Sequence, residues 1–217
     1  MSDDAKSSRA GLAAIAIVAF LVLVAVIAYF QTRDDRPRLL LVGDSITAIS
    51  EKRLTASLDG RWKVSVSGAP KRTAPQRIDD LPLLEAIKPE AVVINLGTND
   101  VIQQVAPDAT ITAITKIAAA FPAARCLALV TVNEDMYNAR DATLGPDAKA
   151  VNDRIVALAK DKGWKIIRWD LIVKQYRAEG EKQGHLTADT IHPGTVGQKL
   201  LADAYSRALV TCPDVKR

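Results

Sequence analysis

The stretch Leu39–Thr47 reads LLLVGDSIT, and the interpretation of the whole chain starts from it. Four apolar residues in a row are typical of a central parallel strand that is covered on both faces. Gly43 lets the backbone turn sharply, and apolar residues at helical spacing follow Ser45. Ser45 is therefore predicted to lie at the amino end of a helix, where backbone N–H groups favour negative charge. A hydroxyl in that place suits a nucleophile, although Asp44 or Ser45 could instead simply cap the helix.

Apolar strands and helical segments alternate along the chain after residue 37. This alternation predicts a three-layer α/β/α domain, in which right-handed crossovers cover a mainly parallel five-stranded sheet. In such sheets the functional site lies outside the carboxyl ends of the strands. The strands are expected at residues 38–42, 62–67, 91–96, 125–132 and 164–169. The main helices are expected at 45–58, 75–87, from 107 onward, 146–162, from 171 onward and 194–211.

His192 is the candidate general base, because a serine hydroxyl is a weak nucleophile until a base takes its proton. Asp189, three residues earlier, could orient the imidazole and stabilise its charged form. The alternative for His192 is a solvated histidine in a loop that enters a helix. His185 lies in a polar stretch and is interpreted as a surface histidine. Asp170 is a rival carboxylate that more simply caps a helix.

Asn99 is the candidate oxyanion donor, because its side-chain amide can direct an N–H toward charge that develops on a carbonyl oxygen. The backbone N–H of Ser45 would be a second donor. Gly97 lets the loop turn close to the site, and Asp100 is expected to anchor that loop. The alternative is an ordinary turn, since Gly-Thr-Asn-Asp sequences are common at turns.

Three motifs, Gly43-Asp44-Ser45, Gly97-Thr98-Asn99-Asp100 and Asp189-Thr190-Ile191-His192-Pro193, together resemble those of the SGNH, or GDSL-type, serine hydrolases. The resemblance extends over roughly residues 38–209. It implies a flavodoxin-like SGNH fold and hydrolysis of an acyl ester, acetyl among the candidates, through a Ser-His-Asp triad and an acyl-serine intermediate. It implies Ser45, Asp189 and His192 as the triad, with no cofactor.

The second sequence block of this family usually carries a glycine whose N–H completes the oxyanion hole, and here the chain departs from the pattern. Residues 67–73 read SGAPKRT. Gly68 matches the first glycine of the block, whereas Lys71 falls where the donor glycine is often found. The third donor is therefore left open between the N–H groups of Gly68 and Lys71. The side chains of Lys71 and Arg72 could bind an acidic part of the substrate or simply be solvated.

Two other functions remain open at this point. The segment from Val151 to Asp170, followed by the His192 motif, also resembles SGNH domains attached to membrane O-acyltransferases. The same triad could then pass an acyl group to a cell-envelope glycan in place of water, depending on whether the site excludes water. The departure in the second block also allows a catalytically silent SGNH-like domain that binds glycans or organises a complex of the cell envelope.

The amino-terminal part of the chain predicts a membrane anchor. Residues 11–30 form an unbroken apolar run, long enough to cross a bilayer as a helix. A cleaved signal peptide is the alternative, but the run is longer than a usual signal core. We expect an uncleaved single-pass anchor, with the catalytic domain outside the cytoplasm. The expected segments are a polar tail (1–10), the transmembrane anchor (11–30), a tether (31–37), the hydrolase-like domain (38–211) and a second tail (212–217).

Charge and composition narrow the partners. The formal net charge is +4, and the Lys and Arg residues are scattered among Asp and Glu without a basic stripe, so no nucleic-acid site is expected. Two histidines and two distant cysteines offer no metal-ligand spacing, so no metal is expected. The expected partners are the membrane and an ester substrate, either a cell-envelope glycan or a small acyl ester. Cys126 and Cys212 could form a disulfide outside the cytoplasm or remain free thiols.

Overall fold

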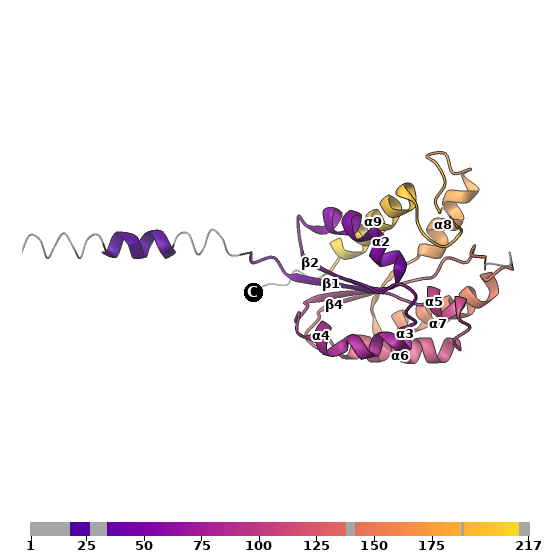
Figure 1. Cartoon of the computed structure of the whole chain (residues 1–217), viewed down its shortest axis with the longest axis horizontal. Coiled ribbons are helices and arrows are strands. Elements are labelled where there is room, and N and C mark those ends of the chain that lie inside the picture. Colours follow the sequence, from indigo (N-terminus) through magenta and orange to yellow (C-terminus); the bar gives the residue numbers. More distant parts are fainter. Residues whose placement is uncertain (1–17, 27–33, 138–141, 188, 213–217) are drawn as a thin grey trace, which may run out of the picture. The chain divides into compact units, whose positions relative to one another are not determined.

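The sheet has five strands in the order β2-β1-β3-β4-β5, and every neighbouring pair is parallel (Figure 1). It is seen in a computed structural model that describes residues 18–26, 34–137, 142–187 and 189–212. The predicted three-layer architecture with a parallel sheet is confirmed. The strands are β1 (Arg38–Gly43), β2 (Lys63–Gly68), β3 (Ala91–Asn95), β4 (Cys126–Val130) and β5 (Lys165–Ile167).

The helices fall close to the predicted segments, with three differences. The helix predicted at 75–87 is three short pieces, in which Pro75 and Pro82 each stand in the first turn of a piece. A short helix, α5, replaces the turn expected after Gly97. The helix after β5 begins at Trp169, because the strand ends at Ile167. The helical elements are α2 (Ser45–Leu58), α3 (Ala74–Arg77), η1 (Ile78–Asp80), α4 (Leu81–Glu85), α5 (Thr98–Ile102), α6 (Pro107–Ala119), α7 (Gly145–Lys162), α8 (Trp169–Ala178) and α9 (Thr195–Val210).

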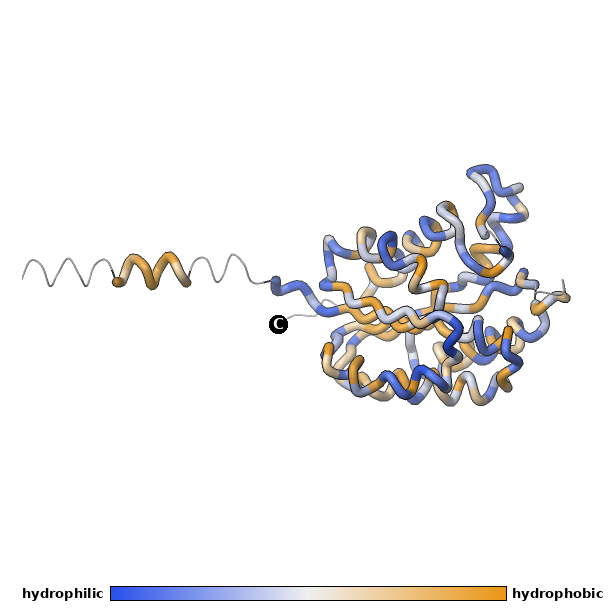
Figure 2. The backbone as a smooth tube through the Cα atoms, in the orientation of Figure 1, coloured by the Kyte–Doolittle hydropathy of each residue, from blue (hydrophilic) through white to orange (hydrophobic). Residues whose placement is uncertain are grey.

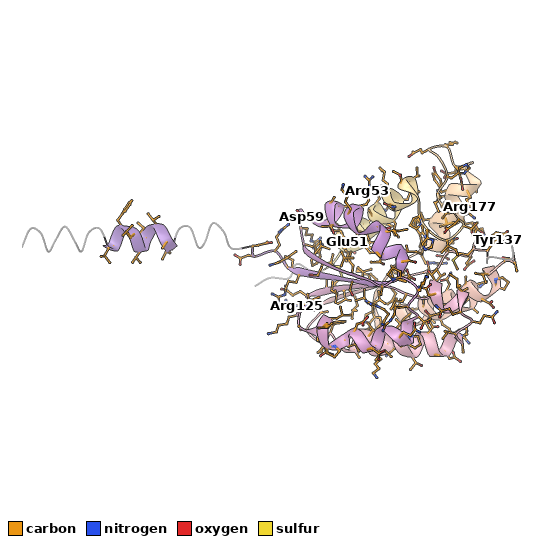
Figure 3. The ribbon with its side chains drawn as sticks, in the orientation of Figure 1. Glu51, Arg53, Asp59, Arg125, Tyr137 and Arg177 are labelled. Carbon is orange, nitrogen blue, oxygen red and sulfur yellow. A yellow bond between two sulfur atoms is a disulfide. The ribbon has the colours of Figure 1, made fainter. Side chains whose placement is uncertain are left out.

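Two apolar cores lie on opposite faces of the sheet, because side chains alternate along each strand. Leu40 and Val42 of β1 pack into the core beneath the helices α3 to α7. Leu39 and Leu41 pack into the other core, which α2, α8 and α9 cover. Figure 1 shows these two helical layers, Figure 2 shows the apolar strands between them, and Figure 3 shows the side chains that fill the space. A central strand buried on both faces is what the apolar run in β1 predicts.

A disulfide joins Cys126, the first residue of β4, to Cys212, just after α9. The two Cα atoms are 5.7 Å apart, although the cysteines are separated by 86 residues in the sequence. Of the two alternatives left open by the sequence, the disulfide is therefore the one that the fold supports. A cross-link over a loop of this length restricts the unfolded chain and is worth about 4.6 kcal/mol on the chain-entropy account.

The chain divides into two units, residues 1–35 and 36–217, and the sheet and its helices belong to the second. In the first unit, residues 18–26 form a helix whose side chains are exposed and apolar (Figure 2). Within the described residues, no helix is both long and apolar enough to cross a membrane. The remainder of the predicted anchor, 11–17 and 27–30, lies outside the described residues.

Candidate functional site

Ser45 is the first residue of α2 and follows the carboxyl end of β1 directly. The turn between them needs a glycine. A Cβ at Gly43 would lie 1.9 Å from Thr47 Oγ1 and 3.0 Å from the Asn95 carbonyl oxygen. Asp44 is the N-cap, and its Oδ1 accepts a hydrogen bond of 2.9 Å from the Ile46 N–H. The capping role is therefore taken by Asp44, which leaves the half-buried Ser45 hydroxyl available for chemistry.

Asp44 is fully buried, and this burial shifts its titration. Desolvation raises the pKa of the carboxyl from its ordinary value of 3.8 to about 6. The nearby Asp100 carboxylate also raises the pKa, whereas the hydrogen bonds from Ile46 and Thr98 and the charge of His192 lower it. The turn that presents Ser45 therefore contains a carboxyl group that is hard to ionise.

His192 lies between the other two members of the predicted triad. Its Nε2 is 3.0 Å from Ser45 Oγ, across 147 residues of sequence. Its Nδ1 is 2.6 Å from Asp189 Oδ2. Asp189 Oδ1 accepts hydrogen bonds from the backbone N–H groups of Ile191 (3.1 Å) and His192 (2.7 Å). The short Asp-x-x-His spacing is therefore folded back on itself, and the three side chains form one hydrogen-bonded chain.

The environment of Asp189 favours its ionised form. Partial burial raises the pKa of the carboxyl, but hydrogen bonds from the His192 ring and from the backbone N–H groups of His192 and Ile191 outweigh it. The net effect places the pKa of Asp189 below its usual value. A carboxylate that stays ionised beside Nδ1 fixes the imidazole with its Nε2 facing the serine.

The loop that carries His192 is held by a residue that the sequence interpretation did not single out. The side-chain amide of Asn133 donates a 2.9 Å hydrogen bond to the Thr190 carbonyl oxygen. The Tyr137 N–H donates to the Thr190 hydroxyl at 3.1 Å. Thr190 has φ +66°, so these contacts stabilise a backbone conformation that is uncommon for threonine. The available signal was the position of Asn133, which follows a strand at the same edge of the sheet as Ser45.

Asn99 is the second residue of α5, and its side chain is buried. Gly97, just before the helix, has φ +123°, which favours glycine, and a Cβ there would lie 2.9 Å from Val132 Cγ2. The Asn99 amide donates a hydrogen bond to the Arg72 carbonyl oxygen at 3.1 Å. An amide nitrogen carries two hydrogens, so a second N–H remains for a ligand.

Asp100 ties the loop after β3 to neighbouring helices. It is fully buried, and its Oδ2 accepts a 2.9 Å hydrogen bond from the Ala74 N–H while Oδ1 accepts one from the Thr110 hydroxyl, also at 2.9 Å. Burial raises the pKa of Asp100, and these hydrogen bonds lower it in part. The carboxylate therefore ties α5 to α3 and α6, and it belongs to the support of the site.

Gly68 and Lys71, the two candidates for the third donor, lie in different surroundings. The Ala69 N–H donates to the Gly43 carbonyl oxygen across the sheet, so the preceding Gly68 N–H points to the free edge of β2. Gly68 instead permits close packing, since a Cβ there would lie 2.5 Å from the Ala48 backbone nitrogen. The backbone N–H of Lys71 has no partner among the described residues, and Gln103 donates a 2.7 Å hydrogen bond to the Lys71 carbonyl.

His185 and Asp170, the alternatives to His192 and Asp189, make their contacts with other residues. His185 is highly exposed, and its Nδ1 lies 2.6 Å from Glu181 Oε2. Asp170 does not cap α8, whose N-cap is Arg168; it lies in the first turn of that helix and is bound by Arg168 and Thr131. In the described part of the chain, no three His, Cys, Asp or Glu side chains gather in a way that could hold a metal ion.

Replacing Asp44 with asparagine should change how stability depends on pH. Because folding raises the Asp44 pKa, the unfolded chain ionises first, and stability falls as pH rises from about 4 to about 6. The asparagine side chain would keep the cap acceptor and remove this loss, which is on the order of 3 kcal/mol. Urea unfolding at pH 4 and pH 7 should show that the free energy of unfolding of Asp44→Asn increases relative to that of the wild type as pH rises. An equal pH dependence in both proteins would contradict the buried carboxyl.

Replacing Lys71 with glycine should stabilise the fold. Lys71 has φ +65°, a left-handed conformation that costs a non-glycine residue about 1 kcal/mol. We expect the melting temperature of Lys71→Gly to rise. The control is Lys52→Gly in the interior of α2, which should lower it, because glycine is a poor helix former. A loss of stability in both variants would show that the Lys71 side chain stabilises the loop.

Comparison with known structures identifies the fold. An acetyl xylan esterase named AlAXEase superimposes with a TM-score of 0.68 at 18% identity, covering 79% of this chain and 99% of that one. The acetylxylan esterase Axe2 of Geobacillus stearothermophilus gives 0.64 at 20% identity, covering 80% and 94%. A GDSL-like lipase of Bacteroides thetaiotaomicron gives 0.65 at 21% identity, covering 80% and 88%. At these identities the likeness establishes a shared fold.

The family follows from sequence. A search of curated proteins gives no significant match to this chain. The model of the GDSL-like Lipase/Acylhydrolase family, however, matches residues 41–200, which include Ser45, Asn99 and His192. The chain therefore belongs to the GDSL-like, or SGNH, family of ester hydrolases.

Proposed function

We propose that the protein is a membrane-anchored serine esterase that acts outside the cytoplasm through Ser45, His192 and Asp189. The observation that carries this proposal is the hydrogen-bonded chain from Asp189 Oδ2 to His192 Nδ1 (2.6 Å) and from His192 Nε2 to Ser45 Oγ (3.0 Å). These are the contacts that a nucleophile, its base and the orienting carboxylate require.

The reaction proceeds in two acyl-transfer steps. Ser45 Oγ attacks the ester carbonyl carbon while His192 Nε2 takes the hydroxyl proton, and the carbonyl oxygen becomes an oxyanion. The intermediate collapses, the C–O bond to the alcohol breaks, and His192 returns the proton to the leaving alcohol. Water then attacks the acyl-serine, with His192 again taking a proton, and the carboxylic acid leaves as Ser45 regains its hydrogen.

Three groups form the proposed oxyanion hole. The Ser45 backbone N–H lies in the first turn of α2, where it has no partner within the helix. The Asn99 amide supplies the second donor. The Lys71 N–H is a better third donor than that of Gly68, because it has no partner among the described residues while the Gly68 N–H points to the edge of the sheet. The loop is fixed by the hydrogen bonds of Asn99 to Arg72 and of Gln103 to Lys71.

Hydrolysis is favoured over acyl transfer to a glycan hydroxyl. The side chains of His192 and Asp189 are 38% and 52% exposed, so water reaches the base directly. A transferase has to keep water away from its acyl-enzyme. A silent binding domain has no need for the complete triad. The substrate we propose is an acyl ester carried by a cell-envelope glycan or by a smaller alcohol, and acetyl esters fit the names of the xylan esterases that share this fold.

The proposed location rests on two features. Residues 11–30 form an apolar run long enough to span a bilayer. The Cys126–Cys212 disulfide suits an oxidising compartment outside the cytoplasm. We expect the full chain to remain with membranes after alkaline carbonate washing, and its cysteines to resist alkylation until they are reduced. Recovery of the full chain in the soluble fraction would contradict the anchor.

The catalytic assignment is tested with a fluorophosphonate probe and a small ester such as p-nitrophenyl acetate. Ser45→Ala should abolish labelling, and Ser45→Ala and His192→Ala should each lower kcat/KM by about 10⁴-fold. His185→Ala is the matched control and should stay within about twofold of the wild type, because the His185 side chain is 92% exposed and its ring contacts Glu181. Retained labelling in Ser45→Ala would overturn the assignment.

A further inference from the structure

A cavity that the proposed chemistry does not use lies between α7 and α8. It measures about 640 Å³, within the range of about 300–1,000 Å³ that is typical of sites for small ligands. It opens beyond the carboxyl ends of β4 and β5, the same edge of the sheet at which Ser45 follows β1. The lining residues on which the argument depends are Glu134, Lys149, Asn152, Arg168, Asp170 and Leu171.

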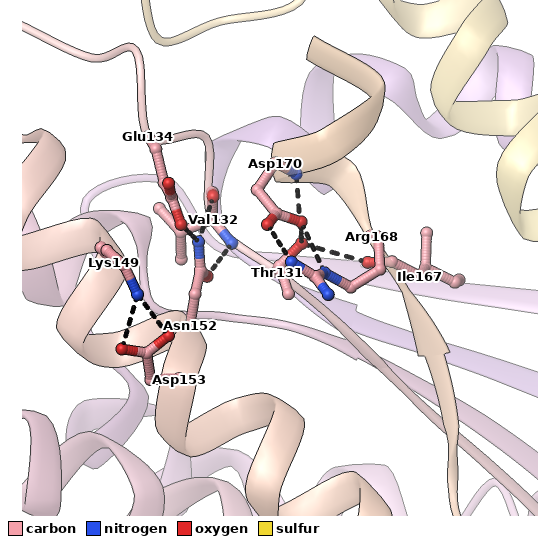
Figure 4. Close-up of polar contacts among 9 residues, drawn as sticks. All are labelled: Thr131, Val132, Glu134, Lys149, Asn152, Asp153, Ile167, Arg168 and Asp170. Atoms are coloured by element: carbon pink, nitrogen blue, oxygen red, sulfur yellow. Dashed lines mark hydrogen bonds and ion pairs between the residues drawn. The ribbon is translucent and has the colours of Figure 1, made fainter. Parts of the chain in front are cut away.

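One wall of the cavity is built around an ion pair between the buried Asp170 carboxylate and the partly exposed Arg168 guanidinium (Figure 4). Asp170 is 5% exposed and receives hydrogen bonds from Arg168 Nε (2.9 Å) and Nη2 (2.6 Å) and from the Thr131 hydroxyl (2.6 Å). Burial raises the pKa of Asp170, but these hydrogen bonds bring it below its usual value. The guanidinium is therefore held in one orientation, and within the described residues no hydrogen bond uses its Nη1.

The opposite wall presents an acceptor. The Asn152 side chain is locked by the backbone of Val132, accepting from its N–H at 2.7 Å and donating to its carbonyl at 2.8 Å. The same amide donates to Glu134 Oε1 at 3.0 Å, which fixes the carboxylate (Figure 4). Glu134 Oε2 has no partner in the described part of the chain. Lys149, one turn away, is paired with Asp153 at 2.8 Å.

The two walls of the cavity favour a neutral ligand that both donates and accepts hydrogen bonds. Lys149 pairs with Asp153 and Arg168 with Asp170, while Asp135 pairs with an arginine outside the lining. The two remaining charges of the lining, Glu134 and Lys174, have opposite signs, so a strongly charged ligand would find little net field. A guanidinium N–H can donate to a sugar hydroxyl and a carboxylate oxygen can accept from one, since each hydroxyl of a sugar ring both donates and accepts. Leu171, which is 48% exposed, offers an aliphatic surface for the C–H face of such a ring.

The cavity is also linked to the catalytic loop. Glu134 lies between Asn133 and Tyr137, which hold Thr190 through the two hydrogen bonds described above. Tyr137 is 45% exposed and offers an aromatic surface on the segment that joins the cavity wall to that loop (Figure 3). A chain of sugar rings that enters the cavity would therefore approach the edge of the sheet that carries Ser45 and His192.

We propose that this cavity is a saccharide-binding subsite, which holds a sugar ring of an oligosaccharide whose ester is cleaved at Ser45. The proposal rests on the esterase function proposed above and narrows its substrate to a glycan ester. Glu134 Oε2 accepts from a ring hydroxyl, and Arg168 Nη1 donates to another oxygen of the same ring. The bound ring places the acylated part of the glycan near the triad.

The test measures binding without catalysis, by calorimetry of the full-length Ser45→Ala protein with two probes, xylotetraose and the tetramer of N-acetylglucosamine. At least one should bind, and its affinity should change by less than about twofold between about 0.05 and 0.5 M NaCl, because no ion pair is formed. Glu134→Gln, added to Ser45→Ala, should weaken binding about tenfold, since the amide still accepts from Asn152 and presents a donor where the free acceptor was.

Matched variants separate the cavity from general surface effects. Lys149→Ala and Lys199→Ala each remove an exposed lysine that pairs with an aspartate one helical turn away, at 2.8 and 3.0 Å, but only Lys149 lines the cavity. Lys149→Ala should weaken binding about threefold, and Lys199→Ala should leave it unchanged. With Ser45 intact, Lys199→Ala should hydrolyse p-nitrophenyl acetate like the wild type, because Lys199 lies outside the cavity and the triad.

The outcomes distinguish this inference from the proposed function. Failure of both tetrasaccharides to bind, or equal binding by Glu134→Gln and its parent, would overturn the subsite. If the wild type still hydrolyses p-nitrophenyl acetate, the esterase function stands. An affinity for these neutral probes that falls more than about tenfold with salt would show that binding does not depend on the proposed hydrogen bonds, and would also overturn the saccharide proposal. If the wild type does not hydrolyse p-nitrophenyl acetate, that result would count against the esterase function, whether or not the tetrasaccharides bind.

Discussion

The parallel pairing of the five strands is the constraint on which the site depends. Because every strand runs in the same direction, every strand end that leads into a functional loop lies at one edge of the sheet. Ser45 follows β1, Asn99 follows β3 and Asn133 follows β4. His192 arrives by another route, on the loop before α9, which packs beside α2 with the Ser57 and Ser206 hydroxyls 2.5 Å apart. The site therefore depends on the sheet for three of these residues and on the packing of two helices for the fourth.

Buried carboxylates support the loops at this edge, and each is stabilised in its own way. Asp44 caps α2 and carries a raised pKa. Asp100 accepts hydrogen bonds from Ala74 and Thr110, and Asp170 accepts them from Arg168 and Thr131. A buried carboxylate without partners would cost several kcal/mol, so these hydrogen bonds are what allow the loops to be polar and rigid at once. The same rigidity is what an oxyanion hole needs, since its donors have to be in place before charge develops.

The sequence predicted the elements well where the signal was local. Buried strands gave continuous apolar runs, and the helices of residues 107–119 and 145–162 followed from proline near their first turn and from apolar spacing. It failed where short pieces are stabilised by tertiary contacts. The helix at 98–102 is five residues long and depends on the buried Asp100 and on packing against α7, which no periodicity over five residues could reveal. Asn133 gives no local signal for the same reason, because its partner is a carbonyl 57 residues away.

The sequence by itself determined the family and the parallel α/β architecture, and it supplied the candidate residues of the site. Its evidence is three local patterns: a glycine turn followed by serine, a Gly-x-Asn-Asp loop and an Asp-x-x-His-Pro loop. Local patterns of this kind can be identified in the sequence without knowing the fold. Only the tertiary structure decided that His192 Nε2 meets Ser45 Oγ and that Cys126 pairs with Cys212. It also decided that the Lys71 N–H lacks a partner among the described residues while that of Gly68 points away, and that a polar cavity lies between α7 and α8. Each of these features depends on which distant segments pack together. The packing is set by burial of the two apolar cores on either side of the sheet. Because residues from the whole chain form these cores, no single stretch of sequence determines the packing.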